Sequence, residues 1–122
     1  MNKTRGQIES EISEAVTRFE KEYMGRGPLE TKTYLIEDMV LVRLKGVLTP
    51  AEHHLAETAE NSGGRELIKR VRVALIEKGR PLLQEEVEGL VRVKVKSLHT
   101  DISTVTGERF ILFTLASVPS FR

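Results

Sequence analysis

Cysteine and tryptophan are both absent from the 122 residues of this chain, and no long hydrophobic run occurs in it. Without cysteine, the chain has no disulfide framework, thiol nucleophile or thiolate metal site. No apolar stretch approaches the roughly 20 residues that a membrane-spanning helix needs. The first residues, Met1–Gly6, lead directly into a charged segment, so no signal peptide is expected. We expect a cytoplasmic protein that would serve a membrane from the aqueous side, peripheral to its inner face.

Aromatic residues are also scarce, at 5% of the chain, so the core is expected to be aliphatic. Hydrophobic residues at 39% and charged residues at 30% are typical of a globular protein. The length predicts a single domain over residues 1–122. Charge is uneven: residues 1–64 hold 8 Lys/Arg and 11 Asp/Glu, whereas residues 65–122 hold 11 and 7. The halves therefore carry −3 and +4, a weak indication of a basic surface.

Apolar residues recur at helical spacing between residues 4 and 24, which predicts an amphipathic helix. Thr4 and Gln7 have the spacing of a capping box, and Gly25 is placed as a left-handed stop. Residues 31–36 and 39–45 then predict a tight hairpin. Thr49 is a candidate N-cap for a second helix that runs to about residue 61, because Pro50 and Glu52 follow it.

Ser62-Gly63-Gly64 is expected to interrupt the chain before a third helix over residues 65–77. That helix would bury a stripe of five apolar residues: Leu67, Ile68, Val71, Ala74 and Leu75. Lys78-Gly79-Arg80-Pro81 is expected to end it, with a short helix after it. Val91, Val93 and Val95 alternate with Arg92, Lys94 and Lys96, which predicts a half-buried strand with a basic outer face. Its hairpin partner is residues 108–118, where Phe110–Phe113 is apolar at both parities and is expected to be covered on both faces.

This order predicts an α+β fold with an antiparallel sheet of about four strands and helices mainly on one face. The Phe19–Pro28 segment and the Lys45–Glu52 segment resemble the MpsC family, and the resemblance covers nearly the whole chain. The family takes its name from a sodium-translocating, membrane-potential-generating system. The resemblance implies no catalytic residues.

Two basic groups and one glycine pair are the candidate sites for binding an anion or a partner. Arg65, Lys69 and Arg72 share one helical face, and Arg92, Lys94 and Lys96 share one face of the predicted strand. Gly63 and Gly64 precede a helix whose N-terminus has free N–H groups for an anion. The alternative without a bound ligand is that the basic groups are ordinary solvated surface and that the glycine pair is a simple linker between helices. The Gly25-Arg26-Gly27-Pro28 segment is interpreted as a structural corner.

No residue pattern indicates catalysis or a cofactor. His53 and His54 are neighbours on a helix and point about 100° apart, and His99 has no ligand spacing around it, so no metal site is predicted. No Ser-His-Asp set or carboxylate pair can be assembled with specificity. An enzyme is therefore the weaker interpretation.

The leading hypothesis is a non-enzymatic accessory or regulatory subunit that acts by partner docking or anion sensing. The resemblance implies its setting, a membrane system linked to ion movement or inorganic carbon, and a membrane-protein partner. Two alternatives stay open: a basic nucleic-acid-binding regulator and a small enzyme acting on an anionic substrate. A homodimer or higher oligomer is also expected, because one helical layer covers only one face of a sheet that is apolar on both.

Overall fold

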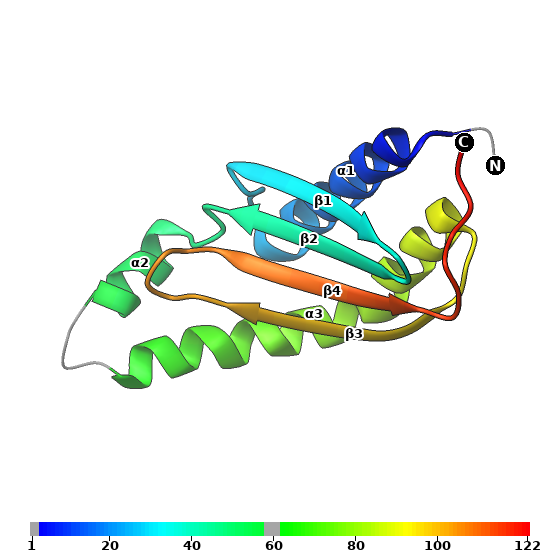
Figure 1. Cartoon of the computed structure of the whole chain (residues 1–122). Helices are drawn as coiled ribbons and strands as arrows, with labels where there is room; N and C mark the ends of the chain where they lie inside the picture. The colour runs from blue at the N-terminus through cyan, green and yellow to red at the C-terminus, as the bar shows by residue number, and fades with distance from the viewer. Residues whose placement is uncertain (1–2, 58–61) are drawn as a thin grey trace.

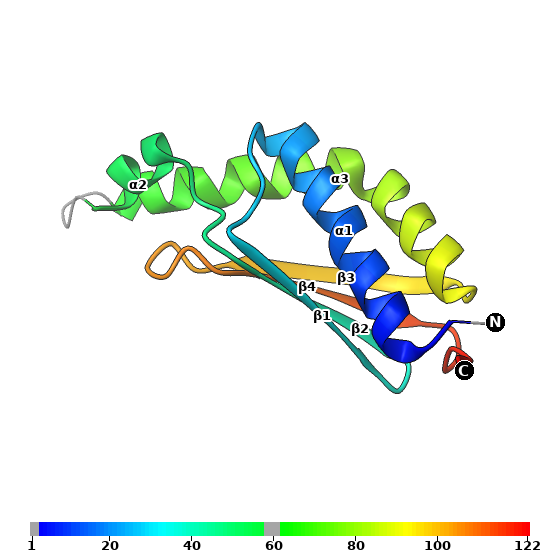
Figure 2. The same cartoon turned by 90° about the horizontal axis from the view of Figure 1, so that it is seen from above.

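Two layers make up the molecule, an antiparallel sheet and a layer of helices on one of its faces (Figures 1 and 2). The structure, a computed structural model, describes residues 3–57 and 62–122. The elements follow the order α1 (Arg5–Met24), β1 (Glu30–Ile36), β2 (Met39–Lys45), α2 (Pro50–Glu57), α3 (Ser62–Val91), β3 (Val95–Ile102) and β4 (Arg109–Leu115). This confirms the predicted α+β fold, with helices α1 and α3 on the same face of the sheet.

Helix α1 has the boundaries that its local signals predict. Gln7 N–H donates to Thr4 Oγ1 at 3.2 Å, and Thr4 N–H donates to Gln7 Oε1 at 2.8 Å, which completes the capping box. Gly25 ends the helix with φ 82°, a left-handed conformation that favours glycine. The inner side of α1 packs on β1, where hydroxyl contacts join Ser13 to Thr33 and Thr17 to Thr31.

The four strands lie in the order β1-β2-β4-β3, so the two hairpins meet through β2 and β4. Val40, Val42 and Leu44 of β2 point toward the helices and are fully buried, together with Ile111 and Phe113 of β4. Residues of the opposite parity point away from the helices. The prediction that Phe110–Phe113 is covered on both faces is therefore wrong within the chain, because Phe110 is 40% exposed.

Helix α3 is longer than predicted, since it continues through all the expected breakers. Ser62, Gly63 and Gly64 form its first turn, and Gly79 and Pro81 lie inside it. A proline in a helix interior removes one hydrogen bond and costs about 3 kcal/mol. Both halves of α3 nevertheless bury residues in one core, among them Ile68, Ile76, Leu83 and Val87. The free energy gained from that packing outweighs the tendency of Gly79 and Pro81 to end the helix.

The buried stripe of α3 also differs from the prediction. Ile68 is buried, but Leu67 and Val71 are exposed, as is Ala74, and Leu75 is half-buried. Helix α2 begins at Pro50 behind the predicted Thr49 cap, where Thr49 and Glu52 exchange two hydrogen bonds. The end predicted for it near residue 61 lies outside the described residues.

The strand predicted from residue 91 begins at Val95 instead. Val91 is the last residue of α3 and is fully buried, and Arg92 follows with φ 60° and donates its N–H to Glu88 O. Val91 lies four residues after Val87, so it continues the buried stripe of the helix as well as it fits an alternating strand. The apolar residues here fit both the helical and the strand periodicity, and the structure adopts the helix. β4 ends at Leu115, before the predicted residue 118.

None of the helices that can be described in the chain is both long and apolar enough to cross a membrane.

Candidate functional site

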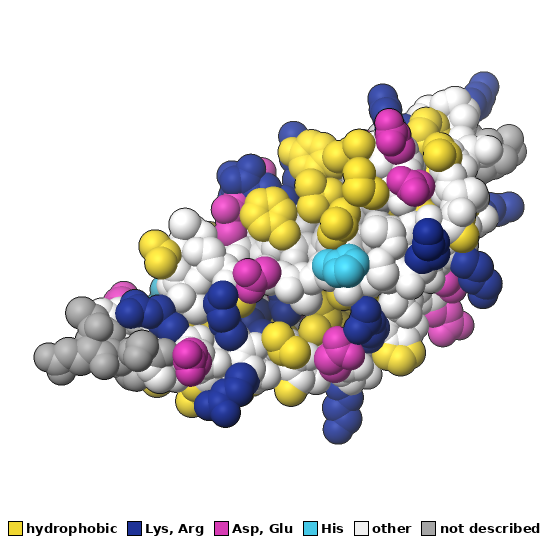
Figure 3. Space-filling model, turned by 60° about the horizontal axis from the view of Figure 1, so that its bottom comes forward, with side chains coloured by type: hydrophobic (Ala, Val, Ile, Leu, Met, Phe, Trp, Pro, Cys, Tyr) yellow, Lys and Arg dark blue, Asp and Glu magenta, His cyan; other side chains and the backbone are white. Residues whose placement is uncertain are grey.

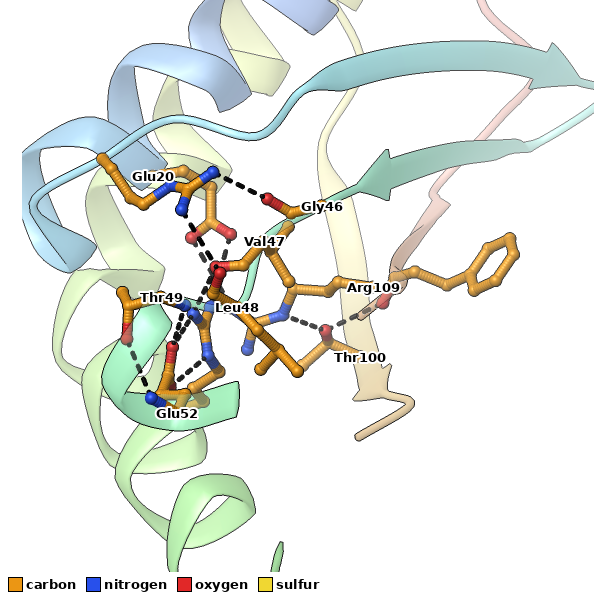
Figure 4. A network of polar contacts seen from close by, with 11 residues as sticks. Glu20, Gly46, Val47, Leu48, Thr49, Glu52, Thr100 and Arg109 are labelled. Atoms are coloured by element: carbon orange, nitrogen blue, oxygen red, sulfur yellow. Dashed lines mark hydrogen bonds and ion pairs between the residues drawn. The ribbon is translucent and has the colours of Figure 1, made fainter. Parts of the chain in front are cut away.

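A cluster of four buried or half-buried charged side chains lies where α1, α3, β4 and the start of α2 meet (Figure 4). We call it the buried charge cluster, and its members are Glu20, Glu52, Arg72 and Arg109. Glu20, Arg72 and Arg109 are each 1% exposed. Charged residues are almost never fully buried without partners, so the arrangement of these partners decides what the cluster does.

Arg72 of α3 is the most extensively bonded member. Its Nε donates to Glu52 Oε2 at 2.9 Å and its Nη2 donates to Glu52 Oε1 at 2.7 Å, a two-pronged contact. Nη2 also donates to Val47 O at 2.7 Å, in the linker between β2 and α2. Arg72 therefore fastens the start of α2 and the preceding linker to α3.

Glu20 of α1 lies between two guanidinium groups. Its Oε1 is 3.7 Å from Arg72 Nη1, and its Oε2 is 3.6 Å from Arg109 Nη1. These four atoms make no hydrogen bond to any described residue, so their attraction is coulombic. Arg109 Nε donates to Thr100 Oγ1 at 3.2 Å, and that hydroxyl donates to Phe110 O. Glu20 thus joins α1 to both α3 and the sheet.

Burial and charge act in opposite directions on these groups. Desolvation raises the pKa of Glu20 above its ordinary value, although Arg109 and Arg72 pull it down. Desolvation lowers the pKa of the Arg109 guanidinium, with Glu20 opposing. Burial also raises the pKa of Glu52, but hydrogen bonds from Arg72 and from the Thr49 N–H outweigh it, so the pKa lies below the ordinary value.

The corner between α1 and β1 lies beside this cluster. Arg26 donates from Nη1 to Leu48 O at 3.4 Å and from Nη2 to Gly46 O at 3.5 Å, which ties the corner to the β2–α2 linker. A side chain at Gly27 would meet Lys21, with the nearest atom at 3.0 Å. Gly25, Arg26, Gly27 and Pro28 thus form the turn from the helix to the sheet, with Gly27 close to the Lys21 side chain.

The three members of the first predicted basic group have separate partners in the structure. Arg72 lies inside the buried charge cluster, as described. Arg65 Nη1 donates to Ala56 O at 3.2 Å and so holds α2 against α3. Lys69 Nζ is 3.3 Å from Asp101 Oδ1, an exposed ion pair across to β3. The three side chains do share one side of α3, but each contacts a partner within the chain.

The second predicted basic group does not line a strand. Arg92 and Lys94 precede β3, and only Lys96 lies within it, at a register irregularity between Val95 and Ser97. All three side chains are exposed, and Lys94 Nζ is 3.8 Å from Glu88 Oε1. The basic strand face expected from their alternation is therefore wrong, because α3 continues to Val91. Whether these residues bind a partner stays a prediction.

The predicted anion site at Gly63, Gly64 and Arg65 lies in the first turn of α3, not in a linker. Gly64 is buried, Gly63 is exposed, and Arg65 is directed to α2. Among the residues with a described position, no three His, Asp or Glu side chains gather closely enough to hold a metal ion. His53 and His54 are exposed on α2, and His99 Nε2 contacts Ser97 Oγ at 2.9 Å.

Sequence reasoning missed Glu20 and Arg109, although the sequence carries a signal for both. Glu20 lies four residues after Val16 and eight after Ile12, on the apolar side of α1. Arg109 has the parity of Ile111 and Phe113 in β4, and Arg72 lies midway between Ile68 and Ile76. Charged residues at core positions of three elements indicate a buried ion network, since each needs a partner.

The cluster balances two carboxylates against two guanidiniums, so it has no spare charge for a ligand. An anion would have to displace Glu20 or Glu52 from the arginines. The arrangement is therefore best suited to fastening α1, α2, α3 and β4 together.

Comparison with known proteins places this chain in a family. The family described as "Na+-translocating membrane potential-generating system (MpsC)" matches residues 4–117. The chain belongs to the MpsC family. The match includes the α1–β1 corner, the β2–α2 linker and every member of the buried charge cluster.

Two relatives of this chain come from Bacillus subtilis (strain 168). Uncharacterized protein YbcI is 44% identical over 117 residues, which cover 96% of this chain and 92% of the relative. Uncharacterized protein YrhF is 32% identical over 96 residues, which cover 75% of this chain and 74% of the relative. No solved structure matches the chain.

Proposed function

We propose that this MpsC chain is a non-enzymatic accessory or regulatory subunit of a membrane-potential-generating system, and that it acts by docking to a membrane component of that system. The family description supplies the system. The choice of docking over anion sensing rests on where the apolar side chains and the cations lie in the fold.

The observation that carries the proposal is an apolar stripe on the outer side of α3. Leu67, Val71 and Leu82 are 44%, 46% and 43% exposed, and their spacing of 4 and 11 residues puts them on one side of the helix. Ala74 is exposed on the same side. Such a stripe, facing away from the chain's own core, suits a partner surface that removes it from water.

The cations give less support to anion sensing. Arg72 and Arg109 are paired with carboxylates inside the cluster, and Arg26 is bonded to two carbonyl oxygens. Lys69 and Arg65 have partners of their own. A sensor for an anion needs cations that a ligand can reach without breaking existing pairs, and of the candidate cations in the described part of the chain only the exposed Arg92 and Lys96 meet this condition.

Co-sedimentation with inner-membrane vesicles tests the proposal. Vesicles from cells that contain the membrane component of the system are compared with vesicles from cells in which its gene is deleted. We expect the chain to sediment with the first and not with the second. Leu67→Ser combined with Val71→Ser should weaken binding by at least about tenfold, since each apolar side chain buried contributes about 1.5 to 3 kcal/mol.

Val73→Ser is the matched control, because Val73 is 50% exposed on a different side of the same helix. This variant should bind as the wild type does. Equal binding to vesicles without the membrane component, or full binding by the double variant, would contradict docking through α3.

A further inference from the structure

The face of the sheet that points away from the helices carries an apolar centre. Tyr34, Ile36 and Phe110 are 36%, 45% and 40% exposed there, and Met39, Leu41 and Leu112 are half-buried beside them. Figure 3 shows hydrophobic side chains gathered in one patch on this side, with charged side chains toward its margins. We call these six residues and their outward-pointing neighbours the open sheet face.

The strand register arranges the open sheet face in three rows across the four strands. The first row is Ile36, Met39, Thr114 and Ser97, the second is Tyr34, Leu41, Leu112 and His99, and the third is Lys32, Arg43, Phe110 and Asp101. Cations of the third row lie on β1 and β2, and its carboxylate lies on β3. The face therefore has opposite charges at its two edges.

We propose that a second copy of this chain covers the open sheet face, related by a two-fold axis that runs along the strands between β2 and β4. Such an axis places β1 of one copy over β3 of the other, and β2 over β4. Each row of one copy then faces the same row of the other copy. Leu41 then faces Leu112 of the second copy, Tyr34 faces His99, Arg43 faces Phe110, and Lys32 faces Asp101. Two sheets packed face to face at about 30° keep these central rows together.

The rim of the face fits this pairing in shape as well as in charge. A hollow of about 200 Å3 is lined by Glu30, Lys32, Tyr34, Arg43 and Lys45. Arg43 pairs with Glu108 and Lys45 lies 3.9 Å from Glu30, so among the described residues Lys32 is the cation of the hollow that has no carboxylate partner. Asp101 at the opposite edge has a side chain that is 80% exposed, and its contact with Lys69 of its own chain is an exposed ion pair, a kind that contributes little to stability and can be exchanged for Lys32 of the second copy. The two-fold axis brings the Asp101 carboxylate of each copy to the hollow of the other copy, so the dimer contains two such contacts.

The other two-fold axis in this plane runs across the strands and fits poorly. It would lay β1 on β1 and set Lys32 against Ile36, Arg43 against Met39 and Asp101 against Ser97. Lys32 would then be buried against an apolar side chain without a carboxylate partner, which is costly. Electrostatic complementarity therefore selects the axis along the strands.

In that dimer the helices point outward, so α3 stays free for the membrane partner. The dimer does not depend on that proposed function.

Light scattering on the full chain tests the dimer. We expect a mass of twice the 13.8 kDa chain at micromolar concentration. Leu41→Glu should raise the dissociation constant by about 100-fold or more, because a carboxylate would face Leu112 of the second copy. Val73→Glu, on the helical side, should leave the mass unchanged, and circular dichroism checks that both variants fold.

A charge exchange tests the axis itself. Lys32→Asp and Asp101→Lys should each weaken self-association by about tenfold, since each sets like charges against one another twice in its own dimer. An equimolar mixture should recover the wild-type affinity, because both contacts then join opposite charges. A monomeric wild type at about 100 µM, a fully dimeric Leu41→Glu variant, or no recovery on mixing would overturn the proposal.

Discussion

At the scale of single residues, Glu20 supplies the charge that two buried guanidinium groups share. Glu20→Gln keeps the shape and removes that charge, leaving Arg109 without a carboxylate partner among the described residues and Arg72 with Glu52 alone. Because burial raises the pKa of Glu20, the fold disfavours its charged form, so we expect the neutral amide to leave the free energy of unfolding unchanged or to raise it, measured with urea at pH 7. Glu22→Gln, exposed on the same turn of α1, should change it by less than about 0.5 kcal/mol. A loss of about 3 to 5 kcal/mol at Glu20 would contradict this and would show that the two guanidinium groups need its charge.

Gly79 lies where α3 passes so close to α1 that no side chain fits between the two helices. A Cβ placed there would lie 2.4 Å from Phe19 Cε2 and 3.1 Å from Tyr23 Cζ, so two stacked rings on α1 would have to move. Gly79→Ala should therefore cost about 1 to 3 kcal/mol by overpacking, despite the better helix propensity of alanine. Thermal melting measures this.

Gly89→Ala is the matched control for Gly79, in the same helix. A Cβ at Gly89 meets nothing within 4 Å. The substitution should stabilise the protein by about 0.5 to 1 kcal/mol, because alanine favours a helix. Melting temperatures above that of the wild type for both alanine variants would contradict the close approach of α3 to Phe19.

At the scale of elements, the end of α3 is set by a strained residue. Arg92 has φ 60°, which costs a non-glycine residue about 1 to 2 kcal/mol. Arg92→Gly should therefore leave the melting temperature unchanged or raise it, with a gain of up to about 1 kcal/mol. Glu85→Gly, an exposed position inside α3, should lower stability by about 1 kcal/mol. A loss at both positions would place the end of the helix elsewhere.

The elements also show which predictions a sequence supports. The boundaries of α1 and the first hairpin could be predicted because their signals are local: the Thr4 capping box, Gly25 and the strand alternation. The course of α3 could not, because Gly79 and Pro81 are local breakers that tertiary packing overrides. Gly79 is needed for its lack of a side chain against Phe19, and no feature near it in the sequence says so.

The candidate site was harder to predict than the fold. Charged residues at core positions are visible in the sequence, but their pairing depends on elements that are far apart along the chain. Glu20 and Arg109 are 89 positions apart in the numbering and meet only once the sheet packs on α1. Arg92, Lys94 and Lys96 alternate within five residues of the sequence, but closeness along the chain does not show that they share a partner.

At the scale of the whole molecule, the carboxyl groups determine the response to acid. The pKa of Glu52 is lowered in the fold below its ordinary value of about 4.5, so its contribution to stability is complete above that pH. This contribution is lost as the pH falls through the lowered pKa. Glu20 has a raised pKa and acts in the opposite sense: the fold disfavours its ionised form, so stability is lost as the pH rises from the ordinary pKa through the raised one.

Glu52→Gln should therefore be less stable than the wild type at pH 7 by about 1.5 to 3 kcal/mol, the usual contribution of a hydrogen bond to a charged group. Below about pH 4.5 the difference should shrink, because Glu52 of the wild type is then being protonated. Urea unfolding at intervals between pH 3 and 7 measures both values. A constant difference across this range would show that the Glu52 pKa is not lowered.

The attachment of α2 has a consequence for motion. Within Pro50–Glu57, Ala56 is the one buried residue, and the polar contacts to α3 among the described residues are those of Glu52 with Arg72 and of Arg65 with Ala56 O. The sheet and α1, by contrast, share one apolar core. Segments with few buried contacts open locally at a fraction of the global free energy. Backbone amides of α2 should therefore exchange with deuterium well before those of β2 and β4, and each opening would bring the guanidinium of Arg72 into contact with solvent.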